Sequence, residues 1–129
     1  NVEGQLEGAI AQGLGYALME DYLIDKKTGS VMSLSFLDYR IPTARDLPKI
    51  DVIIVEEPSL SGPFGAKSVG ENGIDAVAAA IGNALYDAAG IRIKTLPITP
   101  EKVIEALESS VVSQKPLCSV SVVTTTNNC

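Results

Sequence analysis

The stretch SGPFGAKSVGENG, residues 61–73, holds four glycines, one proline, one lysine and one glutamate, and IDAVAAAIGNALYDAAG, residues 74–90, follows it directly. Glycine permits tight turns and close approach of the backbone to a neighbour. The alanine-rich run after it has the composition and apolar spacing of a helix. The sequence therefore predicts a backbone-exposing loop with one cation and one carboxylate, placed immediately before a helix.

A nucleotide-binding P-loop is the first interpretation of such a loop, because glycine-rich turns at helix N-termini bind phosphate. That motif requires lysine directly after its second glycine, followed by serine or threonine. Here Ala66 separates Gly65 from Lys67, and Gly62 lies only three residues before Gly65. The spacing argues against a P-loop.

Helical periodicity appears in three places. Residues 4–22 carry apolar side chains at every fourth position, which predicts a buried helical face. That face comprises Leu6, Ile10, Leu14, Leu18 and Tyr22, with Ala9 and Ala17 beside them. The second helix is predicted to start at an Asn72-x-x-Asp75 cap and to end at Gly90. Its predicted core face comprises Ile74, Val77, Ala78, Ile81, Leu85 and Ala88. The third is predicted to begin with Thr99 as N-cap and Pro100 in its first turn, and to end near Leu107.

A second stripe on the first helix consists of Gln5, Gly8, Gln12 and Gly15, spaced three, four and three residues apart. Each glycine inside a helix costs roughly 1 kcal/mol relative to alanine, so something must approach this face closely. Tight packing against another element and close approach of a ligand both satisfy that requirement. The pattern alone leaves the two open.

Short strands are predicted between the helices, which gives an α+β fold class of mixed helices and short strands. Residues 31–36 alternate in polarity after a turn at residues 25–30, and residues 50–57 are apolar and β-branched between two prolines. Residues 92–96 are a third candidate. Glu56 and Glu57 are neighbours on one predicted strand, so they point to opposite faces and form a poor acid/base pair.

Composition excludes several classes of function. The sequence has no histidine, which removes Ser-His-Asp and Cys-His catalysis and histidine-ligated zinc. A net charge of −6 with ten lysines and arginines argues against nucleic acid as a partner. The two cysteines, Cys118 and Cys129, form neither a disulfide framework nor a CxxC metal site, and we expect no metal ligand from this chain. No run is apolar enough for a membrane span, and we expect a cytoplasmic protein.

Two features concern the ends of the chain. It begins with Asn1 rather than methionine, which we interpret as a sign of a fragment or processed piece. Residues 109–129 contain eight serines and threonines among 21 residues, and we predict a mobile tail or weak edge strand there. The expected organisation is one domain over residues 1–108 and a tail over residues 109–129.

Three separated stretches carry a family resemblance: VEGQLEGA with QGLG at residues 2–9 and 12–15, YRIPT at residues 39–43, and GAKSVGE at residues 65–71. In this order they resemble the C-terminal part of the molybdenum-binding large subunit of the xanthine dehydrogenase and aldehyde oxidase family, the molybdenum hydroxylases. The likeness covers roughly residues 1–108. It implies the C-terminal portion of a molybdopterin-binding domain.

The resemblance also implies functional roles. Glu71 matches the catalytic base beside molybdenum, and Gln5 matches a glutamine whose amide hydrogen-bonds the pterin. Gln12 is assigned to the cofactor because it lies on the same stripe. The loop residues implied to line the cofactor are Gly65, Ala66, Lys67, Ser68, Val69 and Gly70. Lys67 is equally interpretable as a local positive charge or as a surface side chain.

The implied activity is oxidation of a purine, an N-heterocycle or an aldehyde with water as the oxygen source. The implied cofactor is molybdenum-molybdopterin, as the pterin itself or its cytosine dinucleotide, with 2Fe-2S and FAD on partner subunits or domains. The remainder of the large subunit is a required partner, so the chain alone is expected to be inactive. Two alternatives stay open, a non-enzymatic truncated fragment and a small anion-binding module that uses the loop and the helix start.

Overall fold

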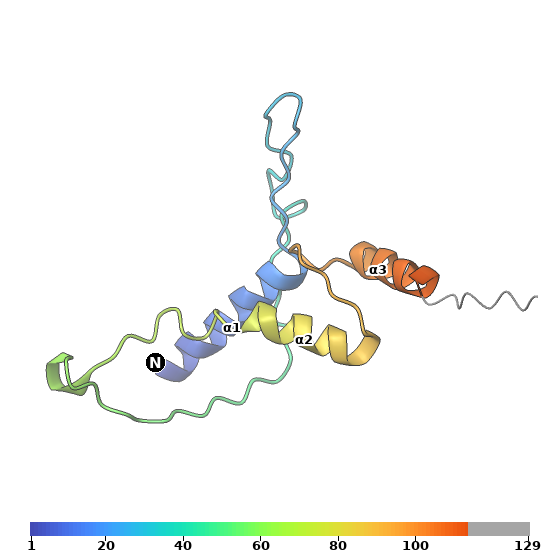
Figure 1. Cartoon of the computed structure of the whole chain (residues 1–129). Helices are drawn as coiled ribbons and strands as arrows, with labels where there is room; N and C mark the ends of the chain where they lie inside the picture. Colours follow the sequence, from blue (N-terminus) through green and yellow to red (C-terminus); the bar gives the residue numbers. More distant parts are fainter. Residues whose placement is uncertain (114–129) are drawn as a thin grey trace, which may run out of the picture.

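The computed structural model describes residues 1–113, and these residues form three α-helices and one 3₁₀-helix (Figure 1). The helices are α1 (Val2–Leu18), η1 (Pro63–Gly65), α2 (Val77–Ala89) and α3 (Pro100–Ser113). Residues 114–129, which include both cysteines and most of the predicted tail, lie outside the described part. No helix within that part is long and apolar enough to cross a membrane.

Helices α1 and α2 pack against each other and form the centre of the molecule (Figure 1). Small residues form the buried side of α1, where Ala9, Gly13 and Ala17 follow one another at four-residue intervals. A Cβ atom placed on Gly13 would lie 2.7 Å from Cβ of Val77 on α2. Gly13 therefore sets how closely the two helices approach.

The predicted buried face of α1 is confirmed for Ala9 and Ala17 but is wrong for its large side chains. Leu6, Ile10 and Leu14 are only half-buried, whereas Leu18 is 37% exposed and Tyr22, beyond the helix, is 61% exposed. The side that α2 covers is the small-residue side, since a close interhelical approach leaves no space for leucine. Most of the predicted core face of α2 is likewise half-buried, and Ala88 is exposed.

The structure confirms the predicted C-terminal end of α2 and contradicts its predicted start. Gly90 terminates the helix at φ +68°, as predicted, and its N–H donates to the Tyr86 carbonyl. The predicted start at Asn72 is wrong, because α2 begins at Val77 after turns in which the Ile74 N–H donates to the Glu71 carbonyl at 3.0 Å. These turns bring Gly73 against α1, where a Cβ atom would meet Cβ of Ala9 at 2.7 Å.

Helix α3 starts beside the C-terminal end of α1. The Ile98 N–H donates to the Ala17 carbonyl at 2.6 Å, and both residues are buried. Thr99 accepts the Lys102 N–H on its hydroxyl, which confirms it as the N-cap. The helix continues to Ser113, six residues beyond the predicted end at Leu107.

The predicted strands do not form within residues 1–113, so the mixed α+β class is not confirmed there. The turn at Asp25 is present, with its N–H donating to Ser30, but the following pairing is a single bridge between Ile24 and Val31. Residues 92–96 also lie outside any strand. A strand requires a hydrogen-bonded neighbour, and the described residues supply none beyond that bridge.

The long connection between this hairpin and α2 includes residues 47–69, here called the arm. The arm leaves the helical centre, carries η1 at its far end and returns to α2 (Figure 1). Its large apolar side chains are exposed, including Ile53 at 87%, Val55 at 85%, Leu60 at 106% and Phe64 at 110%. The arm therefore has almost no core of its own.

Candidate functional site

The glycine-rich loop turns back on itself before it reaches the helical centre. The Ser59 N–H donates to the Gly65 carbonyl at 3.0 Å and closes the turn around η1. Gly65 has φ +80°, and a Cβ atom there would lie 2.9 Å from Cβ of Pro58. Phe64 also adopts a left-handed conformation, at φ +53°. Gly65 is therefore required both by its backbone angle and by the neighbouring chain.

After the turn, the chain passes along an open hollow of about 610 Å³. Lys67, Ser68 and Val69 line one part of it. Residues 54–58 of the arm and Val2 of α1 line another, so the hollow joins the arm to the start of α1. Lys67 is exposed and shares the hollow with the carboxylates of Glu56 and Glu57.

Gln5 connects α1 to the loop. Its side-chain Nε2 lies 3.5 Å from the Gly70 carbonyl oxygen, a long hydrogen bond between residues 65 positions apart. Gly70 immediately precedes Glu71, so the amide assigned to the pterin lies beside the backbone one residue before the residue assigned to catalysis. The sequence predicted both residues but not this contact.

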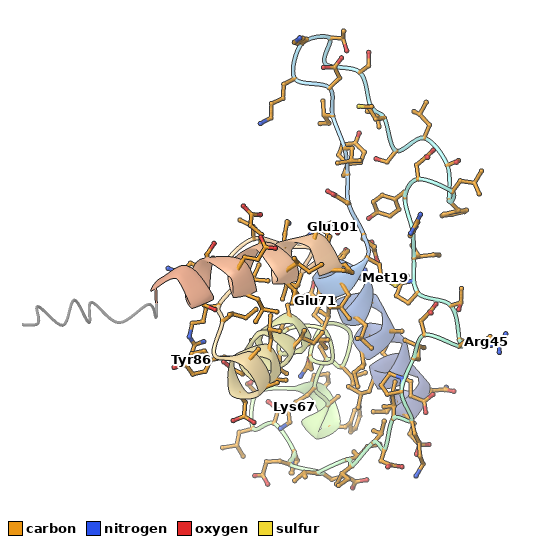
Figure 2. All side chains as sticks on the ribbon, turned by 90° about the vertical axis from the view of Figure 1, so that its right-hand side faces the viewer. Met19, Arg45, Lys67, Glu71, Tyr86 and Glu101 are labelled. Carbon is orange, nitrogen blue, oxygen red and sulfur yellow. The ribbon has the colours of Figure 1, made fainter. Side chains whose placement is uncertain are left out.

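Glu71 lies at the α2 end of the loop segment, and Lys67 lies towards η1 (Figure 2). The Glu71 side chain is exposed, and its carboxylate has no hydrogen bond or ion pair among residues 1–113. The backbone beside it is fixed, because its carbonyl accepts the Ile74 N–H and Gly73 packs against Ala9. A fixed backbone with a free carboxylate suits a group that has to accept a proton.

Gln12 is not brought to the loop. Its Nε2 donates to the Tyr16 hydroxyl at 3.2 Å, one turn further along the same helix. The two glycines of the predicted stripe also differ. Nothing would lie within 4 Å of a Cβ atom on Gly8, whereas one on Gly15 would collide with the Glu20 carboxylate and lie 2.9 Å from Pro42. Close packing accounts for Gly15, but not for Gly8.

A polar contact that the sequence did not predict holds the YRIPT stretch against α1. The Tyr39 hydroxyl donates to Oε2 of Glu20 at 2.5 Å, and this hydrogen bond raises the pKa of Tyr39. The Glu20 carboxylate lies over Gly15, in the space that a side chain there would fill. The sequence signal for this contact is that Gly15 lies five residues before Glu20, which leaves space for the carboxylate. That spacing does not identify Tyr39 as the hydrogen-bond donor to Glu20.

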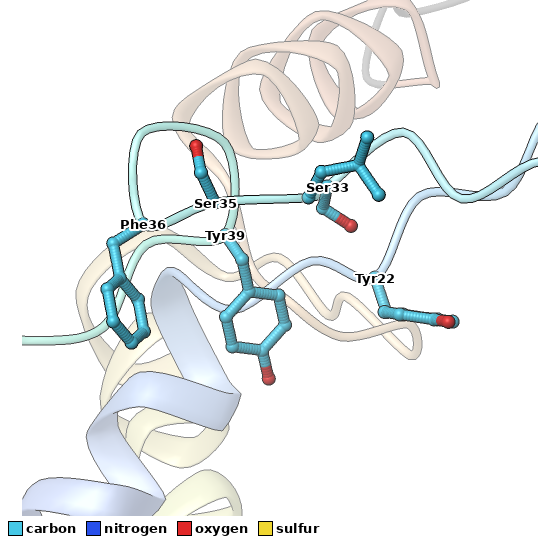
Figure 3. Close-up of a pocket in the computed structure, with 6 residues that line it drawn as sticks. Tyr22, Ser33, Ser35, Phe36 and Tyr39 are labelled. Carbon is cyan, nitrogen blue, oxygen red and sulfur yellow. The ribbon is translucent and has the colours of Figure 1, made fainter.

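A second hollow, of about 450 Å³, lies at the base of the hairpin next to the end of α1 (Figure 3). Its lining is mainly aromatic and aliphatic, from Tyr22, Ser33, Leu34, Ser35, Phe36 and Tyr39. None of the residues assigned to the cofactor or to catalysis contributes to it. The predicted site and this hollow are therefore separate.

The loop supplies hydrogen-bond donors suited to a large anionic cofactor. The N–H groups of Lys67, Ser68 and Val69 have no acceptor among residues 1–113, and the Gln5 amide has a second N–H to offer. No group of three or more histidine, cysteine, aspartate or glutamate side chains within those residues is arranged to hold a metal ion. The free N–H groups fit a ligand that carries several hydrogen-bond acceptors.

Comparisons with known proteins identify the family. Residues 1–48 match the family model of the molybdopterin cofactor-binding domain. The chain is 45% identical over 103 residues to the putative xanthine dehydrogenase molybdenum-binding subunit XdhA of Escherichia coli, covering 80% of this chain and 14% of that protein.

Solved structures are similar as well. Quinoline 2-oxidoreductase from Pseudomonas putida superposes with a TM-score of 0.76 and 35% identity, over 83% of this chain and 14% of that one. Aldehyde oxidoreductase from Desulfovibrio desulfuricans gives a TM-score of 0.69 and 46% identity, over 81% and 11%. The chain thus spans about one seventh of the relatives that it matches. It belongs to the xanthine dehydrogenase and aldehyde oxidase family of molybdenum hydroxylases, as a part of the molybdenum-binding subunit.

Proposed function

We propose that this chain is a catalytic part of a molybdenum hydroxylase that oxidises a purine, an N-heterocycle or an aldehyde with water as the source of oxygen. The observation that carries the proposal is the meeting of Gln5 and the loop, 3.5 Å from Nε2 to the Gly70 carbonyl. In this proposal Gln5 holds the cofactor next to the backbone that leads to Glu71, and Glu71 transfers the proton. Relatives named as xanthine dehydrogenase and aldehyde oxidoreductase support the reaction class.

The cofactor would be held by the Gln5 amide and by the free N–H groups of Lys67, Ser68 and Val69 in the loop of residues 65–70. An amide side chain both donates and accepts, so it can pair with the mixed edge of a pterin. Gln12 would reach the same group only by leaving Tyr16, so its proposed contribution is secondary. When bound, molybdenum-molybdopterin, with or without a cytosine dinucleotide, supplies the centre that accepts two electrons from the substrate.

Glu71 is the proposed general base. The oxygens of its exposed carboxylate are free to accept a proton from the water-derived oxygen that attacks an electron-poor carbon. The turn that begins at its carbonyl holds the side chain at the end of the loop. Lys67 adds a positive charge at the same loop, where it would stabilise an anionic group.

The reaction requires partners. We propose that the remainder of the molybdenum-binding subunit completes the pocket, and that 2Fe-2S and FAD groups on other subunits or domains remove the electrons in the cytoplasm. The relatives include proteins named as subunits, such as the large subunit of nicotine 6-hydroxylase. One helix face and one loop are too little to enclose a pterin, so the isolated chain should bind neither molybdenum nor cofactor.

A non-enzymatic piece is the second candidate, and the exposed apolar side chains of the arm favour it. A small anion-binding module is the third, supported by the free N–H groups of the loop. The experiment that separates them uses the complete molybdenum-binding subunit that contains this sequence. Stoichiometric molybdenum and pterin in that subunit support the first candidate, and their absence supports the others.

The decisive variant is Glu71→Gln, which keeps the size of the side chain but removes the base. Molybdenum content should stay unchanged, and turnover per bound molybdenum should fall by roughly 10²- to 10⁴-fold. The matched control is Asp75→Asn, since Asp75 is an exposed carboxylate four residues further on. Equal turnover for the two variants would show that Glu71 is not the base.

A further inference from the structure

Residues 50–57 of the arm have the composition of a strand but no strand partner. None of the backbone N–H and C=O groups from Leu47 to Pro58 takes part in a hydrogen bond with residues 1–113. Unpaired backbone groups are normal in water and costly once buried. The segment IDVIIVEE therefore presents eight N–H groups and eight C=O groups without a protein partner.

Its side chains indicate that the segment does not stay in water. Ile53 and Val55 are 87% and 85% exposed, and Ile54 between them is 50% exposed. Only Ile50 and Val52 are half-buried, with Ile50 in a hollow beside Gly4 and Gly8 of α1. Apolar β-branched residues on both faces are typical of a strand that is covered on both faces.

The comparison structures bear on what covers it. This chain superposes on quinoline 2-oxidoreductase over 83% of its own length with a TM-score of 0.76, yet that stretch is only 14% of the other protein. The open arrangement of helices and arm is thus a conformation that a piece adopts inside a much larger chain. The relatives contain about six times more polypeptide than this chain, which is ample to supply strands on either side.

We infer that residues 50–57 form a β-strand of a sheet whose neighbouring strands belong to the remainder of the molybdenum-binding subunit. Backbone pairing would satisfy the free N–H and C=O groups, and apolar side chains of the same sheet and of the layers against it would cover Ile53 and Val55. The strand would fix the arm, and through the arm the loop that ends at Glu71. The inference rests on the proposed function in one respect, namely that the partner is the rest of that subunit.

Hydrogen–deuterium exchange on the complete subunit tests this inference. Amides of residues 51–57 should exchange at least about a hundredfold more slowly in the complete subunit than in the 129-residue chain. Amides in the turn at residues 26–28 serve as the internal reference. Fast exchange at residues 51–57 in a subunit that carries molybdenum and turns over substrate would overturn the inference and leave the proposed function standing.

Other results of these measurements would also support or overturn the inference. Slow exchange in a subunit without molybdenum would support the strand and contradict the proposed function. Slow exchange in the 129-residue chain, with a concentration-dependent dimer, would show that a second copy is the partner and would overturn the inference. Proline at Ile54 or Val55 removes an N–H, and at least one of the two variants should lower the yield of assembled subunit tenfold or more. Ile54→Val keeps the N–H, the β-branch and an apolar side chain, and it should assemble normally.

Discussion

The helical centre and the arm differ in how far their apolar side chains are buried. In the centre, α1 and α2 approach so closely that alanine and glycine are buried, and Val77 fits against Gly13. In the arm, isoleucine, valine and leucine are exposed along a backbone without hydrogen bonds. The centre is held by contacts within this chain, whereas the arm requires contacts from outside it.

The candidate site lies where these two regions meet. Gln5 belongs to α1, and Glu71 ends the segment that returns from the arm, with the Gly70 carbonyl between them. One half of the site is thus carried by an element with its own packing. The other half depends on how the arm is held. Substitutions that act on one region only should separate the two contributions.

The largest effect on stability is expected at Gly13. Gly13→Ala would place a methyl group within 2.7 Å of Cβ of Val77 and force α1 and α2 apart. Overpacking of this kind costs about 1–3 kcal/mol. The matched control is Gly8→Ala in the same helix, where nothing lies within 4 Å and helix propensity should stabilise by up to about 1 kcal/mol.

Denaturant unfolding followed by helical circular dichroism measures both changes. Shifts of the same sign for the two alanine variants would mean that the interhelical contact does not hold the centre.

The next effect concerns the junction between the regions. In the complete subunit, Gln5→Ala should lower cofactor occupancy more than turnover per bound molybdenum, because the proposed role of the side chain is to hold the cofactor and not to react. Loss of a buried hydrogen bond costs about 1–3 kcal/mol, which is roughly a five- to 150-fold fall in affinity. Molybdenum analysis and turnover of the same sample give the two numbers. Full occupancy with lost turnover would reassign Gln5 to the chemistry.

The sequence predicted the centre better than the arm for a physical reason. Helices satisfy their own backbone, so the periodicity of residues 4–22, the glycine at position 90 and the Thr99 cap were sufficient to locate all three. A strand needs a second chain segment with which to pair. Residues 50–57 have the composition of a strand, but no such segment pairs with them within residues 1–113, so they do not form one. Which face of α1 is buried was also beyond the pattern, because leucines and a glycine–alanine row both fit a packed face.

The site shows the same division. Gln5 and Glu71 were identified by resemblance, and their meeting through Gly70 required the folded loop. Gln12 shares the stripe with Gln5, but the structure gives it Tyr16 as partner. The Tyr39 contact with Glu20 was missed because neither residue stands in a pattern with the other.

That contact is the basis of the third prediction. Gly15→Ala would displace the Glu20 carboxylate, so Tyr39→Phe should cost less stability in the Gly15→Ala background than in the wild type. The hydrogen bond raises the pKa of Tyr39, so it favours the protonated phenol in the folded state. Its contribution is therefore complete below the ordinary tyrosine pKa near 10 and is lost as pH rises through the raised pKa.

The pH dependence is measured as the difference in free energy of unfolding between the wild type and Tyr39→Phe. The stability advantage of the wild type over Tyr39→Phe should shrink above pH 10, and it should stay constant between pH 7 and pH 9. Additive effects of the two substitutions, or an advantage independent of pH, would show that Glu20 does not hold Tyr39 in solution.

The smallest effect on stability is expected when valine is replaced by alanine, once in the arm and once in the helical centre. Val55 is 85% exposed on the arm, whereas Val77 is half-buried against Gly13. In the 129-residue chain, Val55→Ala should change the free energy of unfolding by less than about 0.5 kcal/mol, because it removes no contact. Val77→Ala should destabilise by about 1 kcal/mol, since the lost packing of two methyl groups exceeds the gain in helix propensity. Val55→Ala should become the more costly of the two in the complete subunit, where the arm is paired. If Val55→Ala destabilised the 129-residue chain as much as Val77→Ala, the arm would already be packed within this chain, and its exposure would not describe the protein in solution.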